Sequence, residues 1–330
     1  MEDEKYIVRY LVIRFSSIGD IVLTTPVVRC LKQQVENAEI HFLTKPANVG
    51  ILESNPYIDE VHTFTTYNET VDKLREIPFD YVIDLQKNLR SKRLINKLKI
   101  LDFTFPKLNW EKWLMTSFLK IDKLPDIHIV DRYMKATRLF DVHNDGNGLD
   151  YFINPTDEVD TKIAFGEDAG CYVAYAIGGQ HATKRMPKEL IAQICGQLND
   201  KVVLLGGPSD VEAAEYICSQ AENCINLCGM FALSQSASIV KQAKYVITHD
   251  TGLMHIAAAF KKNIVSVWGN TIPKFGMTPY LPGEKSRIFE VEGLKCRPCS
   301  KLGYEKCPKK HFRCMMEQNI IEIVKYCNEI

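Results

Sequence analysis

An aspartate stands beside a glycine in residues 14–20, directly after a short apolar run. A carboxylate within hydrogen-bond reach of a bound hydroxyl can act as its general base. The same residue, Asp20, can also cap the helix that follows, a role in which Asp contributes about 1 kcal/mol. The residues alone therefore leave a catalytic and a capping role open for Asp20.

A second segment, residues 177–187, combines two glycines with two adjacent cations and a proline. The backbone N–H groups of such a loop, the hydroxyl of Thr183 and the ammonium of Lys184 can together bind a diphosphate. The glycine spacing fits neither the Walker lysine loop nor the dinucleotide-binding loop. A surface turn with solvated charges is the alternative interpretation.

In a third segment an apolar run leads into Asp250 and then into a predicted helix. The first amides of that helix, at Thr251, Gly252 and Leu253, would form an anion site, and Asp250 could accept hydrogen bonds from sugar hydroxyls. Helix capping by Asp250 and simple packing of His255 are the alternatives.

A further group of residues shares a positive charge. The basic cluster consists of Lys87, Arg90, Lys92 and Arg93. Such a run usually forms a solvated helix face, but it could also bind phosphate or acidic groups.

Four cysteines near the end of the chain have the spacing C-x2-C-x7-C-x6-C: Cys296, Cys299, Cys307 and Cys314. Four thiolates could hold zinc or an iron–sulfur cluster. Because a second C-x2-C pair is missing, we expect reduced cysteines that pack the end of the chain rather than a metal.

These segments must be positioned by an α/β framework. Apolar runs expected to be strands alternate with amphipathic stretches, which predicts parallel sheets with helices on both faces. The expected strands are 10–15, 40–43, 61–64, 81–85, 100–105, 171–177, 202–205, 245–248 and 264–268. A helical pattern covers 21–34, and further helices are expected from Pro187, Asp210, Ala232 and Leu253.

The periodicity lapses into a polar, turn-rich stretch at 144–160, which suits a linker. We therefore predict two Rossmann-like, doubly wound domains, 1–150 and 151–330, facing each other across a cleft. Ligands in such sheets bind beyond the carboxyl ends of the strands, where all the polar loops described above are expected.

Composition excludes several classes of protein. Lys plus Arg and Asp plus Glu each number 41, so the chain has no net positive charge that would attract nucleic acid. No apolar stretch approaches the roughly 20 residues that span a bilayer. The acidic start and the charges that break the first apolar run are unlike a signal peptide, so we expect a cytoplasmic protein.

Residues 249–259 and 267–277 closely resemble the ADP-heptose:lipopolysaccharide heptosyltransferases, glycosyltransferase family 9. Residues 14–20, 84–91 and 184–187 resemble further stretches of that family in the expected order. The resemblance implies the two-domain GT-B architecture, transfer with inversion from ADP-heptose to the lipopolysaccharide inner core, and no metal or cofactor. It leaves peripheral contact with the inner membrane open and does not define an oligomeric state.

The resemblance also implies roles for individual residues. Asp20 would be the catalytic base, and Lys184 would neutralise the departing ADP. The donor-binding positions would be Thr183, Lys184, Asp250, Thr251, Gly252 and Leu253, with His255 and Glu212 as weaker matches. The acceptor, bound by the first domain, would contact Ser17, Gly19, Lys87, Arg90, Lys92 and Arg93.

Some positions depart from the family pattern. His249 replaces an expected small polar residue, and Arg185 with Met186 stands where many members carry an aromatic residue.

Two other functions stay open. One is a GT-B transferase for another nucleotide sugar or a protein acceptor, and the other is a nucleotide-sugar-binding module without catalysis.

Overall fold

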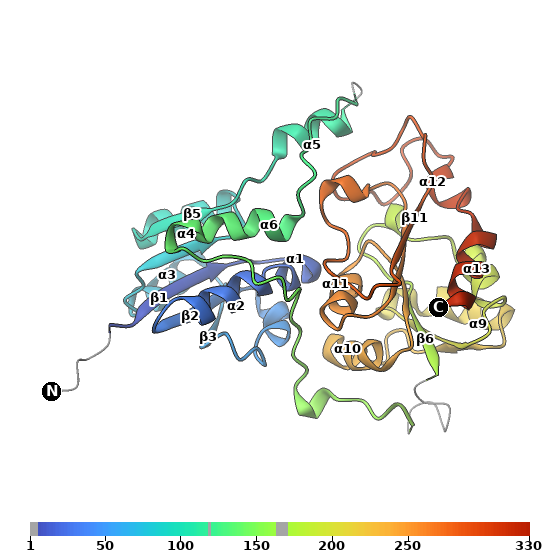
Figure 1. Ribbon diagram of the computed structural model, residues 1–330, viewed down its shortest axis with the longest axis horizontal. Coiled ribbons are helices and arrows are strands. Elements are labelled where there is room, and N and C mark those ends of the chain that lie inside the picture. Colours follow the sequence, from blue (N-terminus) through green and yellow to red (C-terminus); the bar gives the residue numbers. More distant parts are fainter. Residues whose placement is uncertain (1–5, 118–119, 163–170) are drawn as a thin grey trace. The chain divides into compact units, whose positions relative to one another are not determined.

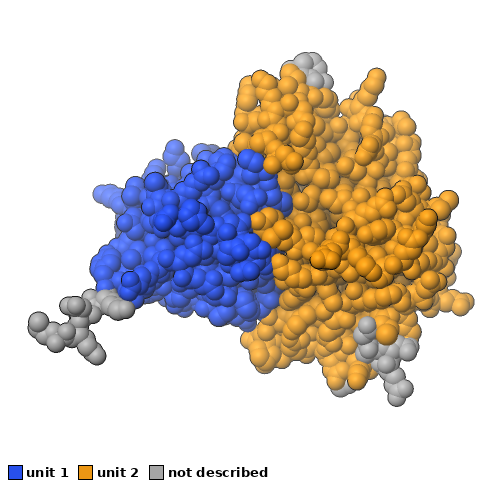
Figure 2. Space-filling model, viewed as in Figure 1, with its two compact units in different colours: residues 1–107, 127–152 blue, residues 108–126, 153–330 orange. Residues whose placement is uncertain are grey.

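The computed structural model describes residues 6–117, 120–162 and 171–330, and the chain divides into two compact units. Unit 1 comprises residues 1–107 and 127–152, and unit 2 comprises residues 108–126 and 153–330 (Figure 2).

Unit 1 is built on a five-stranded sheet in the order β3-β2-β1-β4-β5, in which every pairing is parallel (Figure 1). Its strands are β1 (Val8–Ile13), β2 (Ala38–Thr44), β3 (Glu60–Thr63), β4 (Tyr81–Asp84) and β5 (Leu101–Thr104). Its helices, with 3₁₀ helices written η, are α1 (Ile18–Val22), α2 (Thr25–Gln34), η1 (Pro46–Ile51), α3 (Tyr67–Arg75), α4 (Leu89–Leu98), α6 (Ile129–Met134) and η2 (Lys135–Phe140).

Alternate residues of β1 face opposite layers of unit 1, as the period of two in a strand requires. Leu11 packs into an apolar cluster with Val71 of α3 and Leu94 of α4. Tyr10 instead meets the ring of Phe140 in η2 edge to face, with centroids 5.1 Å apart. Helices therefore cover both faces, and β1 is buried between them.

Unit 2 contains a six-stranded parallel sheet in the order β11-β10-β9-β6-β7-β8. Its strands are β6 (Tyr172–Ala176), β7 (Lys201–Leu205), β8 (Cys224–Asn226), β9 (Val246–His249), β10 (Ile264–Trp268) and β11 (Arg287–Glu290). Its α-helices are α5 (Asn109–Thr116), α8 (Lys188–Cys195), α9 (Val211–Gln220), α10 (Leu233–Gln242), α11 (Gly252–Ala259), α12 (Arg313–Met316) and α13 (Ile320–Glu329). Its 3₁₀ helices are η3 (Pro155–Asp157), η4 (Ala182–Lys184), η5 (Pro208–Asp210) and η6 (Pro273–Phe275).

The central strand of this sheet is likewise covered on both faces. Tyr175 of β6 lies in an apolar cluster with Ile194 of α8 and Ile323 of α13. Tyr172 points the other way, and its hydroxyl donates to the carbonyl of Ile239 in α10 at 2.6 Å. Two doubly wound α/β sheets are thus present, which confirms the predicted fold class.

The structure differs from the sequence analysis in several local details. The edge strands β8 and β11 were not predicted, because both are short and only partly buried. The helix expected over 21–34 is two helices, since α1 ends at Val22 and α2 starts afresh with Pro26 in its first turn. Among the described residues, no helix is both long and apolar enough to cross a membrane.

A single cut near residue 150 does not describe the two units, because residues 108–126 group with unit 2. In that segment Asp122 forms an ion pair with Lys274, and Lys112 lies over the ring of Phe275 at 5.7 Å from its centroid. The carbonyl of Asn109 accepts a hydrogen bond from Lys301 at 3.0 Å. These contacts are long-range in sequence, so periodicity could not reveal them.

A buried arginine holds the end of unit 1 against α2. Arg29 is 3% exposed and binds Asp145 through two hydrogen bonds of 2.7 and 2.8 Å. It also donates to the carbonyl of Gly148 at 2.9 Å and forms an ion pair with Asp150. The hydrogen bonds from Arg29 hold the pKa of Asp145 well below its usual range.

We predict that Arg29→Met lowers the free energy of unfolding by about 3 kcal/mol, because it leaves two carboxylates without their cation. The exposed Arg138 is the matched control, and Arg138→Met should change stability by no more than about 0.5 kcal/mol. Urea denaturation measures both. Equal stability of the two variants would contradict the assignment.

The pH dependence of this effect has a definite sign. Since folding lowers the pKa of Asp145, its contribution is complete above the ordinary Asp pKa of about 3.9 and disappears as pH falls through the lower folded value. The stability difference between wild type and Arg29→Met should therefore hold from about pH 7 to pH 5 and shrink in stronger acid.

Candidate functional site

Asp20 lies in the first turn of α1, just beyond the carboxyl end of β1. One of its oxygens, Oδ2, accepts hydrogen bonds from the backbone N–H of Ser17 at 3.1 Å and from its hydroxyl at 2.8 Å. Asp20 thus has the capping contact that the sequence allowed. Its side chain is 22% exposed, so solvent still reaches the carboxylate.

The other oxygen of Asp20 binds a buried arginine. Arg14 Nη2 lies 2.7 Å from Asp20 Oδ1. Arg14 Nη1 donates to the carbonyl of Leu85 at 2.5 Å and to the hydroxyl of Tyr133 at 2.9 Å. Burial lowers the pKa of Arg14, but Asp20, Tyr133 and Asp84 together outweigh burial, so the pKa is raised. Asp20 is therefore oriented by a permanent cation that the sequence analysis did not assign.

The segments after β4 and β5 add lysines near these residues. Lys107 Nζ donates to the carbonyls of Gln86 at 3.0 Å and Lys87 at 2.9 Å. Burial, followed by the charge of Arg14, lowers the pKa of Lys107. Asp84, at the end of β4, anchors the loop by accepting the N–H groups of Gln86 and Lys87.

Aromatic contacts divide the basic cluster. Arg90 lies over the rings of Phe15 and Phe64, 5.9 and 5.6 Å from their centroids. Arg93 lies over Tyr67 at 4.7 Å, and Lys87 Nζ donates to the carbonyl of Phe105 at 2.7 Å.

Lys92 lies two residues beyond Arg90 on α4, a rotation of about 200° at 3.6 residues per turn. It therefore occupies the other flank of the helix. Of the four cluster residues, Arg90 is the one that lies over Phe15, which precedes the N-cap Ser17 and the helical Gly19.

In unit 2, the loops after three neighbouring strands meet at Asp250. Lys184, in the segment after β6, places Nζ 2.7 Å from Asp250 Oδ2. Thr271, after β10, donates its hydroxyl to the same oxygen at 2.8 Å. The side chains of Lys184 and Asp250 are 17% and 10% exposed, so the pair is largely buried. We call Lys184, Asp250 and the start of α11 the anion site.

The start of α11 supplies the amides of the anion site. Thr251 is the N-cap, and Gly252 and Leu253 are the first two helical residues. Their N–H groups point out of the helix start, where an α-helix offers no internal acceptor. A Cβ atom added to Gly179 would lie 3.5 Å from Thr251 Cγ2, so the glycine-rich loop approaches this helix start closely. The structure thus brings the second and third sequence segments together.

Thr183 differs from the expectation of a phosphate contact. It is 3% exposed, and its hydroxyl accepts from the N–H of Tyr304 at 2.8 Å and donates to the Tyr304 carbonyl at 3.1 Å. These contacts hold the segment that carries Lys184 in place.

The end of the chain supports the anion site at a second point. Arg297 donates to the carbonyl of Thr271 at 2.7 Å and forms an ion pair with Glu290 at 2.6 Å. Gln318 donates to the carbonyl of Trp268 at 3.1 Å. Residues beyond 290 therefore fix the loop after β10, which the sequence analysis did not foresee.

The two histidines of the third segment are internal. His249 is fully buried, and its Nε2 accepts the N–H of Met186 at 3.2 Å. Burial, followed by the charge of Arg185, lowers the pKa of His249 to about 3, so the ring is neutral. His255 is 2% exposed within α11. His249 thus links the loops after β9 and β6.

Glu212 is exposed in the first turn of α9. Near it, Asp210 binds Arg185 at 3.0 Å and would lie 2.5 Å from a Cβ atom on Gly178. A side chain at Gly178 would therefore displace this ion pair.

All eleven cysteines carry free thiols. Cys314 is buried, and Cys296, Cys299 and Cys307 are partly buried. Burial and the neighbouring Cys296 raise the pKa of Cys299.

Comparison with known proteins places these loops in a family. The model of glycosyltransferase family 9 (heptosyltransferase) matches residues 69–308. The chain is 24% identical to lipooligosaccharide heptosyltransferase 2 of Haemophilus influenzae, over 89% of this chain and 92% of that protein. It is 35% identical to lipopolysaccharide heptosyltransferase 2 of Escherichia coli, over 33% of this chain and 32% of that protein.

A solved structure shares the fold. The structure of E. coli ADP-heptose lps heptosyltransferase II superposes with a TM-score of 0.74 at 21% identity, covering 98% of both chains. The family match spans most of the chain, from α3 to the residues that hold the anion site. The chain belongs to glycosyltransferase family 9, the heptosyltransferases, and is a glycosyltransferase with the GT-B fold.

Proposed function

We propose that this enzyme transfers heptose from ADP-heptose to the inner core of lipopolysaccharide, with inversion and without a catalytic metal. The observation that carries the proposal is the Lys184–Asp250 pair at the start of α11, 2.7 Å apart. The names of the relatives from H. influenzae and E. coli support a lipid-linked saccharide acceptor, and the E. coli structure supports ADP-heptose as donor.

Unit 2 would bind the donor. The ammonium of Lys184 has three donors, so it can hold Asp250 and still bind a phosphate oxygen. The amides of Thr251, Gly252 and Leu253 would bind the same diphosphate, and Asp250 would accept heptose hydroxyls. Thr183 would act by positioning Lys184 rather than by contact, since Tyr304 engages its hydroxyl. Glu212 and His255 stay weaker candidates for donor contacts.

The chemical step follows from these charges. Asp20 takes the proton from an acceptor hydroxyl, whose oxygen attacks the anomeric carbon of heptose. The bond between that carbon and the diphosphate oxygen breaks, and ADP leaves with the electron pair. Lys184 and the helix amides stabilise the negative charge on ADP, as a metal ion does in other transferases. Attack opposite to the leaving group inverts the anomeric configuration.

Unit 1 would bind the acceptor through Ser17, Gly19 and the basic cluster. Arg90 is its best-placed member, because it lies over Phe15 of the Asp20 loop. A cytoplasmic reaction, with contact to the inner membrane through the lipid of the acceptor, stays a prediction.

The proposal is tested by mixing the enzyme with ADP-heptose and a core lipopolysaccharide that lacks heptose. ADP release should match the mass gain of the acceptor, and NMR should show the inverted anomer. Turnover only with another nucleotide sugar or with a protein acceptor would replace the proposed substrates. Tight donor binding without release would indicate a module without catalysis.

We predict that Asp20→Asn lowers turnover by on the order of 10² or more and leaves donor affinity nearly unchanged. Asparagine can still accept the Ser17 hydrogen bonds, so the cap persists while the base is lost. Asp141→Asn, at an exposed aspartate of the same unit, is the control. If Asp20→Asn turns over like wild type, Asp20 is only a cap.

We predict that Lys184→Ala weakens ADP binding by roughly 1.5 to 3 kcal/mol, because one charge-assisted contact to the diphosphate is lost. Lys241 is the matched control, since it lies in the last turn of α10, which leads into the amino end of β9, and pairs with Glu158 at 2.8 Å. Competition by ADP measures both variants. An unchanged ADP affinity in Lys184→Ala would remove the phosphate role from this loop.

We predict that Arg90→Ala raises the acceptor KM about tenfold and spares the donor KM, since a charged hydrogen-bond partner of the acceptor is lost. The wild-type acceptor KM should itself rise with salt. Lys92→Ala, measured separately, should have the smaller effect, and Lys97→Ala at the far end of α4 is the control. Equal changes in donor and acceptor KM, or none, would refute acceptor binding at this helix.

A further inference from the structure

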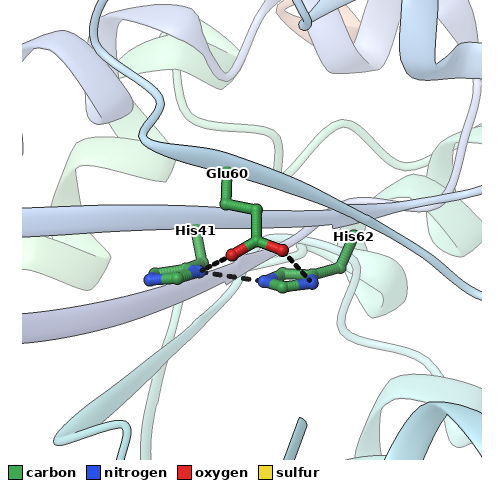
Figure 3. A group of neighbouring side chains, drawn as sticks. All are labelled: His41, Glu60 and His62. Atoms are coloured by element: carbon green, nitrogen blue, oxygen red, sulfur yellow. Dashed lines mark hydrogen bonds and ion pairs between the residues drawn. The ribbon is translucent and has the colours of Figure 1, made fainter. Parts of the chain in front are cut away.

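Three potential metal ligands in unit 1 lie side by side on β2 and β3: His41, Glu60 and His62 (Figure 3). Register brings them together, because His41 pairs with Glu60 and Leu43 pairs with His62. Residues two apart on a strand share a face, so all three point to the same side of the sheet. The proposed transfer reaction uses none of them.

The ligand atoms of this group converge. His41 Nδ1 lies 2.9 Å from His62 Nε2 and 3.6 Å from Glu60 Oε2. The second oxygen, Glu60 Oε1, lies 3.5 Å from His62 Nδ1. The two imidazole rings are nearly parallel, at 8°.

The remaining nitrogen of His41 has its own partner. His41 Nε2 lies 2.8 Å from Glu39 Oε1, and the other oxygen of Glu39 accepts from Arg9 Nε at 3.1 Å. A carboxylate at this nitrogen favours the tautomer with hydrogen on Nε2, which leaves the Nδ1 lone pair directed at His62. The charge of Glu60 Oε1, 3.5 Å from His62 Nδ1, favours hydrogen on that nitrogen and a bare Nε2.

Two bare ring nitrogens repel each other at 2.9 Å, so a hydrogen or a metal ion must lie between them. A single proton would meet this need, and so would a metal ion. We propose that His41 Nδ1, His62 Nε2 and Glu60 Oε2 bind a divalent transition-metal ion of the Zn²⁺ type. The site is separate from the transfer chemistry and does not depend on the proposed substrates.

The geometry suits Zn²⁺ in particular. With metal–ligand bonds of about 2.0 to 2.1 Å, tetrahedral coordination separates ligand atoms by about 3.3 Å. The observed separations of 2.9 and 3.6 Å lie on either side of this value, and the ligand atoms of all three residues lie within 4.8 Å of one another. Two histidines, one carboxylate and a water form a recurrent zinc ligand set.

One ligand of this group is buried and another is exposed to solvent. The side chain of His41 is 4% exposed, and Phe79 meets its ring edge to face at 4.9 Å. Glu60, in contrast, is 56% exposed on the edge strand β3, so an ion and its water can enter from solvent. A bound ion would hold β3 against β2. His62 lies two residues before Phe64, and the ring centroids of Phe64 and Phe15 are 5.0 Å apart.

The test uses the full chain, stripped of metal with a chelator and titrated with Zn²⁺ by calorimetry. Wild type should bind one more equivalent of Zn²⁺ than His62→Gln. Glu60→Gln should lower the Zn²⁺ affinity of this site at least tenfold. Glu39→Gln, which removes only the outer carboxylate, should weaken it by about 10 to 100-fold. His143→Gln is the control, because His143 is exposed and pairs with Asp141 elsewhere in unit 1.

Cobalt distinguishes this site from the thiols of the chain. Co²⁺ in the proposed site should show a visible band without the intense near-ultraviolet absorption of cobalt thiolates, and His62→Gln should lose that band. Since Glu60 is exposed, Glu60→Gln should keep the wild-type circular dichroism and so report on binding rather than folding. Equal Zn²⁺ stoichiometry in wild type and His62→Gln, or a band with thiolate character only, would overturn the proposal and leave a proton between the rings.

Discussion

A basic side chain held against an aspartate stands at the carboxyl end of each parallel sheet. Arg14 meets Asp20 at 2.7 Å after β1, and Lys184 meets Asp250 at 2.7 Å after β6 and β9. Parallel strands end at one edge of a sheet, so loops from distant parts of the sequence must meet there. The ion pairs hold these side chains in fixed positions in partly buried places, and the proposed base and leaving-group chemistry both depend on that placement.

The anion site also depends on residues that have no proposed contact with a substrate. Tyr304 holds Thr183 through two hydrogen bonds, and Arg297 binds the carbonyl of Thr271. His249, neutral because it is buried, links the loop after β9 to Met186. The cysteine-containing end of the chain is therefore part of the framework that positions Lys184 and Asp250.

Local patterns predicted the alternating strands, the polar loops and the positions of Asp20, Lys184 and Asp250 at strand ends. Sequence could not predict contacts that depend on the tertiary structure. The role of Arg14 requires the β4 loop and Tyr133, and residues 108–126 join unit 2 through long-range contacts. The His41–Glu60–His62 group was likewise invisible, because it arises from the register of two strands about 20 residues apart.

We propose that Lys184 and the amides at the start of α11 stabilise the departing ADP without a metal ion. The most direct test is the initial rate of ADP release from ADP-heptose, with a heptose-deficient core acceptor, in excess EDTA and after addition of Mg²⁺. The rate should be the same in both conditions, and the acceptor should gain one heptose for each ADP released. A rate that disappears in EDTA and returns only with Mg²⁺ or Mn²⁺ would show that the enzyme requires a metal ion.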